Sequence, residues 1–167
     1  YVRPEYRSIY SRNLESLIVK ITTDDGLEGW GEALAPVGPE ISGTIIASLF
    51  KPFLLGEDPR RVNVLWNKLY DSMRERGYFT GFMVDAITAI DVALWDIIGK
   101  NNQQPVSKSM GGQFNKKLLA YASALMPTSP MDAANMAMEY VQNGYKAIKF
   151  GWGPIGKDGK DIERIKE

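Results

Sequence analysis

The sequence contains neither cysteine nor histidine. Without cysteine the chain has no disulfide, no thiolate nucleophile and no cysteine metal ligand, a pattern typical of cytoplasmic proteins. Without histidine it lacks the base of Ser-His-Asp and Cys-His catalysis and the commonest zinc ligand. Acid–base chemistry in this chain therefore falls to lysine, tyrosine, aspartate or glutamate, and we expect a cytoplasmic protein.

An excess of charge of one sign is also missing, because 20 basic residues balance 20 acidic ones. This balance argues against a nucleic-acid partner, which requires a basic footprint. No apolar run approaches the ~20 residues of a membrane span, and no signal-peptide pattern opens the chain. We therefore expect neither a nucleic-acid nor a membrane partner for these 167 residues.

The stretch Met83–Lys100 has the clearest periodicity in the chain. Its large apolar residues recur at steps of three and four, which predicts a core helix that ends near Gly99. These residues are Ile87, Ile90, Leu94, Ile97 and Ile98. Alanines between them keep the helix thin enough for a neighbour to approach closely.

The residues before this helix predict strands followed by helices. Alternating segments at 16–22 and 27–34 flank the turn Asp24-Asp25-Gly26, which predicts a β-hairpin. Helices are expected at 39–50, where Pro52 should interrupt, and at 60–76. Segregated strands and helices are typical of an α+β domain.

The pattern changes after a turn-rich segment that carries Gly111-Gly112. A strand at 117–124, a helix at 130–143 and a strand at 145–150 predict a β-α-β unit with parallel strands, and another helix should follow from 158. We therefore expect two domains, 1–115 and 116–167.

Lys149 is the candidate catalytic residue. In the predicted strand Ile148 and Phe150 share the face that covers helices, so Lys149 should point to the opposite face near the carboxyl end. A lysine among apolar neighbours can act as a base when its pKa is lowered. An ion pair with a carboxylate on an adjacent strand is the alternative interpretation.

Two further groups of residues are candidates for binding. The segment Tyr1–Asn13 contains Arg3, Tyr6 and Arg12, which could bind an anionic substrate because guanidinium groups pair with carboxylates; a solvated arm is the alternative. Glu28 and Glu32 lie on one predicted strand, where a solvated or paired role competes with a metal role. We assign no metal ligand in this chain.

Four motifs together carry a resemblance to a known family. They are DDGLEGWGE from Asp24, AITAIDVALWDIIGK from Ala86, PVSKSMGG from Pro105 and GYKAIKFGWG from Gly144. In this order the chain resembles the mandelate racemase/muconate lactonizing branch of the enolase superfamily. The resemblance implies an α+β capping domain followed by the first βαβ part of a modified TIM barrel.

The resemblance also implies a chemistry. Relatives remove a proton α to a carboxylate and hold the enediolate on Mg²⁺, whose carboxylate ligands come from later barrel strands and are thus expected beyond Glu167. Lys149 matches the first lysine of the family's Lys-x-Lys motif, whereas Gly151 stands where the second lysine, often the base, is found. A His-Asp pair on later strands takes that role in some relatives.

These implications lead to an expected function. We expect part of a Mg²⁺-dependent acid-sugar dehydratase, a lyase acting on a small carboxylate substrate, in a polypeptide of ~350–400 residues that forms a homo-oligomer. The 167-residue chain alone should be inactive. A racemase or epimerase of the same family is the first alternative, and a non-catalytic assembly module is the second.

Overall fold

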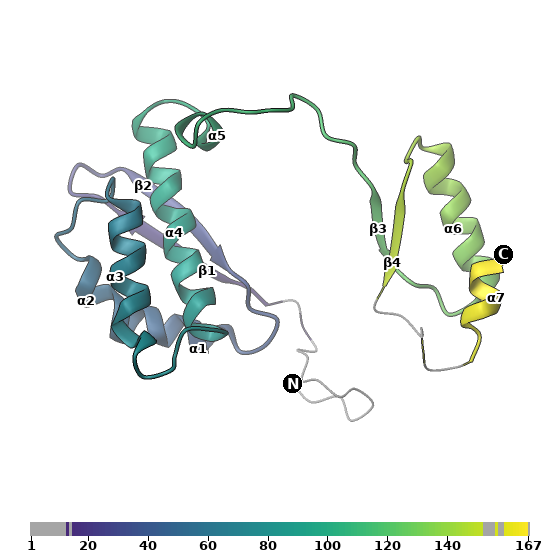
Figure 1. Ribbon diagram of the computed structural model, residues 1–167, viewed down its shortest axis with the longest axis horizontal. Helices are drawn as coiled ribbons and strands as arrows, with labels where there is room; N and C mark the ends of the chain where they lie inside the picture. Colours follow the sequence, from purple (N-terminus) through teal and green to yellow (C-terminus); the bar gives the residue numbers. More distant parts are fainter. Residues whose placement is uncertain (1–12, 14, 152–155, 157–158, 167) are drawn as a thin grey trace. The chain divides into compact units, whose positions relative to one another are not determined.

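The computed structural model describes residues 13, 15–151, 156 and 159–166. Contacts divide the chain into two compact units, Tyr1–Gln113 and Phe114–Glu167. Each unit has its own strands and helices, and each is described separately below (Figure 1). Within the described residues no helix is long and apolar enough to cross a membrane.

The first unit begins with the predicted β-hairpin. Strand β1 (Leu17–Thr22) pairs antiparallel with β2 (Glu28–Ala33), in a register that joins Leu17 to Ala33 and Thr22 to Glu28. The turn between them contains Gly26 at φ 85°, a left-handed conformation that glycine adopts without strain. Alternate residues of both strands are turned toward the helices, as their sequence pattern predicts.

The next helical segment is longer than predicted. Helix α1 (Pro39–Ile45) continues through a π-helical turn, η1 (Ile46–Phe50), into α2 (Lys51–Leu54). The expectation that Pro52 interrupts the helix is therefore wrong. A proline ring collides with the carbonyl four residues earlier in a regular α-helix, and the wider π turn before Pro52 provides room for it.

Helices α3 (Val62–Arg74) and α4 (Phe82–Asn101) complete the core of this unit. The predicted apolar face of α4 is buried, although Ile98 is only partly so. The helix ends at Asn101, one residue beyond the predicted end at Gly99 and Lys100. A side chain on Gly99 would contact the Gln104 carbonyl oxygen at 3.1 Å, so this glycine permits the chain to turn back into α5 (Val106–Ser109).

Strand β2 lies directly against the backbone of α4. A Cβ atom on Gly31 would overlap the carbonyl oxygen of Ala89 and would lie 2.8 Å from the amide nitrogen of Ala93. A Cβ atom on Gly29 would overlap the carbonyl oxygen of Ala93 in the same way. Ala89 and Ala93 are themselves fully buried. Because β2 has glycines and α4 has alanines at the contact, the strand and the helix can pack closely.

Two polar residues of α4 bind the edge of β2 that faces away from β1. The Trp30 amide donates a hydrogen bond to Asp96 Oδ2 (2.9 Å), and Lys100 Nζ donates to the Glu28 carbonyl oxygen (2.8 Å) and to Asp96 Oδ2 (2.7 Å). Burial opposes ionisation of Asp96, but these hydrogen bonds outweigh it and lower the pKa of its carboxyl group. Asp96 and Lys100 thus provide hydrogen-bond partners for the Trp30 amide and the Glu28 carbonyl, which an edge strand otherwise leaves exposed.

The second unit contains a parallel β-α-β arrangement. Strand β3 (Ala122–Leu125) leads through α6 (Pro130–Gln142) to β4 (Ile148–Gly151), and α7 (Asp161–Lys166) follows. The strands are parallel, with Ser123 paired to Lys149. The predicted strand at 117–124 starts five residues before the observed β3, which begins at Ala122. A β-strand requires a paired neighbour, and the partner strand β4 begins only at Ile148, opposite Ala122.

The close approach of β2 and α4 gives a direct test. Gly31→Ala should lower the free energy of unfolding by roughly 1–3 kcal/mol or more, because its Cβ has no space beside the α4 backbone. Urea denaturation measures the change. Gly43→Ala is the matched control: its Cβ would lie 3.4 Å from Leu17 Cδ1 and it is helical, so stability should stay equal or rise slightly. Equal stability of both variants would contradict the packing described.

Candidate functional site

Lys149 lies on the face of the β3–β4 sheet opposite to α6. Phe150 lines a hollow of about 400 Å³ together with Ala133 and Ala137 of α6, so Phe150 points to the helical side. Successive residues of a strand point to opposite faces, which places Lys149 on the side without a helix. Its side chain is exposed within this unit.

The neighbours of Lys149 on this face come from both strands. Its ammonium group lies over the ring of Tyr121, 5.8 Å from the ring centroid, and Ser123 is its partner in the register. Leu125 pairs with Gly151 at the carboxyl end, where a Cβ on Gly151 would meet no atom within 4 Å. Among the described residues Lys149 forms no ion pair, so the carboxylate partner considered as an alternative is not found there.

Sequence reasoning did not select Tyr121 and Ser123. Because they alternate with Ala122 and Ala124, the sequence could have placed both on one face of the strand. Their proximity to Lys149, however, depends on the register between β3 and β4. What this face offers chemically is a cation beside a hydroxyl group and an aromatic ring. Such a set can bind a carboxylate and stabilise negative charge.

The other predicted binding residues lie elsewhere in the chain. Arg3, Tyr6 and Arg12 fall outside the described residues. The segment at 33–41, which in relatives of the resembled family lies near the substrate, joins the end of β2 to the start of α1, and Leu34 within it is exposed. Gly38 ends this loop at φ 58°, directly before Pro39 begins the helix.

The carboxylates of the hairpin have partners. Glu28 forms an ion pair with Lys20 (2.9 Å), and Glu32 accepts a hydrogen bond from Ser16 Oγ (2.7 Å). Across the part of the chain that the structure describes, no group of three or more Asp, Glu, His or Cys side chains could hold a metal ion. The described residues therefore do not form a Mg²⁺ site, and the resemblance places its ligands beyond Glu167.

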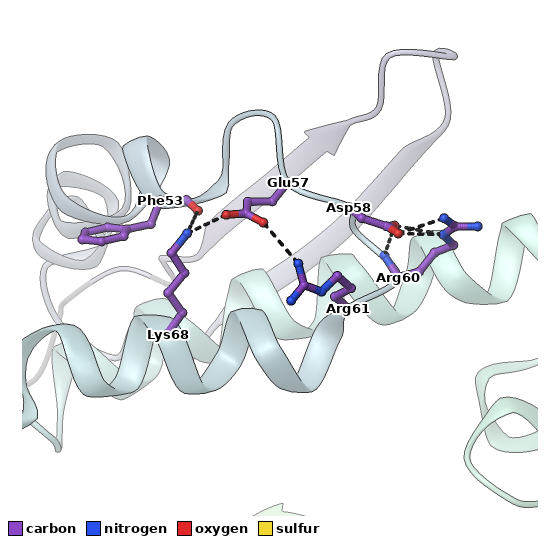
Figure 2. Close-up of polar contacts among 6 residues, drawn as sticks. All are labelled: Phe53, Glu57, Asp58, Arg60, Arg61 and Lys68. Carbon is purple, nitrogen blue, oxygen red and sulfur yellow. Dashed lines mark hydrogen bonds and ion pairs between the residues drawn. The ribbon is translucent and has the colours of Figure 1, made fainter.

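A groove of about 710 Å³ in the first unit is the larger hollow. Its lining includes the core residues Leu65, Ile90 and Leu94, together with the charged connector between α2 and α3. Figure 2 shows that Glu57 binds Lys68 (2.6 Å) and Arg61 (3.9 Å), while Lys68 also donates to the Phe53 carbonyl oxygen. These contacts join the connector to α3 and hold it in place.

Asp58 and Arg60 form a second pair in this connector (Figure 2). Arg60 Nε and Nη2 donate to the two carboxylate oxygens at 2.9 and 2.8 Å, and the Arg60 amide also donates to Oδ1. These hydrogen bonds, the side-chain ones first, lower the pKa of Asp58 to about 2. A carboxylate that is paired in this way supports the turn before α3 and is not available as a metal ligand or base.

A hairpin covered by helices and followed by a parallel β-α-β unit defines a class: a capping domain joined to the start of a β/α barrel. The family model for the mandelate racemase/muconate lactonizing enzyme N-terminal domain matches residues 2–111. The chain therefore belongs to the mandelate racemase/muconate lactonizing enzyme family, as predicted. Chains of the enolase superfamily are also its structural neighbours.

Two curated relatives have named activities. D-galactarolactone cycloisomerase of Agrobacterium fabrum is 34% identical over 90% of this chain and 40% of its own length. Arabinonate dehydratase of Saccharolobus solfataricus is 34% identical over 92% of this chain and 41% of its own length. The chain thus spans about two fifths of the relatives that it matches.

Solved structures show the same fold. An enolase superfamily member from Agrobacterium tumefaciens is 34% identical, with a TM-score of 0.88 over 97% of this chain and 41% of its own. A mandelate racemase/muconate lactonizing protein from Paracoccus denitrificans, complexed with magnesium, is 31% identical, with a TM-score of 0.72 over 81% of this chain and 37% of its own.

The Asp58–Arg60 pair predicts a titration. Asp58 should titrate near pH 2, and Arg60→Gln should raise its pKa only part of the way to 3.8, because the backbone hydrogen bond remains. The pair stabilises the fold above pH ~4, and this contribution is lost as the pH falls toward 2. Carboxyl ¹³C NMR measures the pKa. The control variant is Arg74→Gln, which removes a cation paired with Asp71 and should leave the pKa of Asp58 unchanged. An Asp58 pKa near 3.8 in the wild type would contradict the assignment of the pair.

Proposed function

We propose that this chain is part of an acid-sugar dehydratase that removes a proton α to a carboxylate. The observation that supports the proposal is the position of Lys149, a cation without a carboxylate partner in the described residues, on the helix-free face of a parallel strand. In β/α barrels that face lines the interior, and catalytic groups gather at the carboxyl ends of the strands. The dehydratase among the relatives supports the same class.

In this proposal Lys149 binds the substrate carboxylate. When a base takes the α-proton, electron density moves onto the carboxylate oxygens, and the ammonium group stabilises the charge that develops there. The β-hydroxyl then leaves with a proton as water, and a carbon–carbon double bond forms. Gly151 offers no side chain for the base, and the proposal assigns no base in this chain.

Substrate recognition in this proposal is shared between two segments of the capping domain. Arg3, Tyr6 and Arg12 contribute cations and a hydroxyl group for a polar, anionic substrate. The segment at 33–41 contributes the exposed Leu34 and Pro36 next to β2.

The remaining parts of the proposal lie outside this chain. We place the Mg²⁺ ligands beyond Glu167, on the later barrel strands where the resemblance implies them. The 167-residue chain alone would then be inactive, and the whole protein would act in the cytoplasm as a homo-oligomer on a small acid sugar. In this proposal residues 1–115 form the cap and residues 116–167 form the first two β/α units.

An isomerase is the second candidate function, because one curated relative is a cycloisomerase. A racemase or epimerase needs bases on both faces of the substrate. Gly151 leaves one of these positions without a side chain, which favours the dehydratase.

Lys149→Ala in the whole protein should lower kcat/KM for an acid sugar by about 10² or more, because one preorganised charge contributes about this much to catalysis. Steady-state dehydration assays with a set of sugar acids measure the effect. Lys146→Ala removes an exposed lysine three residues earlier and should leave the rate unchanged. Near wild-type activity of the Lys149→Ala variant would contradict the assignment.

The assembly alternative has its own test. The second unit exposes large apolar side chains, including Leu118, Leu119, Leu125, Ile162 and Ile165. If further barrel strands cover them, the 167-residue chain should self-associate as its concentration rises, which sedimentation velocity measures. A monodisperse 18.7 kDa monomer at all concentrations would contradict the barrel proposal.

A further inference from the structure

Asp91 of α4 forms no hydrogen bond or ion pair through its carboxylate among the described residues. It lies in a crevice between α3 and α4 whose other lining side chains are apolar or aromatic, Trp66 among them. Burial there raises the pKa of its carboxyl group, because no cation compensates the lost hydration. A carboxylate in such surroundings is costly unless a cation approaches it.

The cations of α3 are already paired. Lys68 binds Glu57, and Arg74 binds Asp71. Arg76 follows α3 and is exposed, and its side chain has no partner among the described residues. The helix pair therefore carries an unpaired anion and an unpaired cation.

Asp91 and Arg76 lie at different levels of the helix pair. Helices α3 and α4 pack against each other (Figure 1), and the short connection at 75–81 makes them antiparallel. Arg76 belongs to this connection. Asp91 comes nine residues after Phe82, the first residue of α4, which corresponds to about 14 Å along the helix axis. This separation explains why the two charges do not pair within one chain.

Between these two levels α3 is aromatic. Trp66 and Tyr70 stack with their ring centroids 4.9 Å apart, and both are only partly buried against the core, as is Met73. Trp66 also lines the crevice that contains Asp91. A guanidinium group that approaches this carboxylate would therefore meet an aromatic ring as well, to which it is attracted.

We propose that this face of α3 and α4 binds the same face of a second copy of the chain, with Asp91 of each copy against Arg76 of the other. A two-fold axis across the helices brings the two levels together in both directions, because such an interface is complementary to itself. A face that carries both signs of charge fits this partner better than a surface of one sign. The proposal rests on the homo-oligomer in the function proposed above and names a surface that forms it.

Neutral variants of the whole protein test the interface. Asp91→Asn and Arg76→Gln should each raise the concentration at which the oligomer dissociates about tenfold or more, because each leaves the opposite charge unpaired at the contact. Sedimentation velocity over a dilution series measures this. Asp85→Asn is the matched control: burial also raises the pKa of Asp85, but six residues are not a whole number of helical turns, so it lies on another face of α4.

Reversed charges give a sharper test. Asp91→Arg and Arg76→Asp should each prevent this association, because like charges then meet in both contacts. An equal mixture of the two variants should associate again, since each contact then joins an arginine to an aspartate. A defect within one chain cannot produce this rescue. Circular dichroism verifies that both variants are folded, and if one is not, the neutral variants decide the question.

Three results would overturn the proposal: a wild-type protein that stays monomeric, neutral variants that associate like the wild type, or a mixture of folded charge-reversed variants that stays dissociated. Each would assign the crevice at Asp91 to a cation from elsewhere in the polypeptide. The dehydratase fails separately. A wild-type protein that dehydrates no sugar acid, while its charge variants dissociate as described, refutes the dehydratase and leaves the interface standing.

Discussion

The contact between β2 and α4 is the constraint on which the first unit depends. Gly29 and Gly31 bring the strand against the helix backbone, and the buried Ala89 and Ala93 allow the same approach from the helix. At this distance Asp96 can accept a hydrogen bond from the Trp30 amide. A larger side chain at the contact would separate strand from helix and would weaken both the apolar packing and this polar contact.

The same contact determines which face of the hairpin is exposed to solvent. Because the hairpin packs with one face on the helices, its opposite face carries Lys20 and Trp30, whose ammonium group and ring lie 5.6 Å apart. The connector before α3 is held by charges that satisfy one another around Glu57 and Asp58. Its ion pairs are therefore structural, and the catalytic candidates lie in the second unit.

The second unit differs because its described residues bury few large apolar side chains. Two parallel strands and α6 bury Ala122 and Ala133, while many of its large apolar side chains remain exposed. The same arrangement presents Lys149, Tyr121 and Ser123 on a face that no described helix covers.

The sequence by itself determined the elements whose periodicity reports burial. These are the helix around Ile87 and Leu94, the alternating hairpin and the β-α-β unit. Alternation along the second strand of that unit also placed Lys149 and Phe150 on opposite faces. The family followed from motifs within these elements. Only the tertiary structure decided the π turn before Pro52, the role of Gly99 in close packing, the start of β3 at Ala122 and the placement of Tyr121 under Lys149. Periodicity records which side of an element is buried, whereas these features depend on which residue of another element lies opposite.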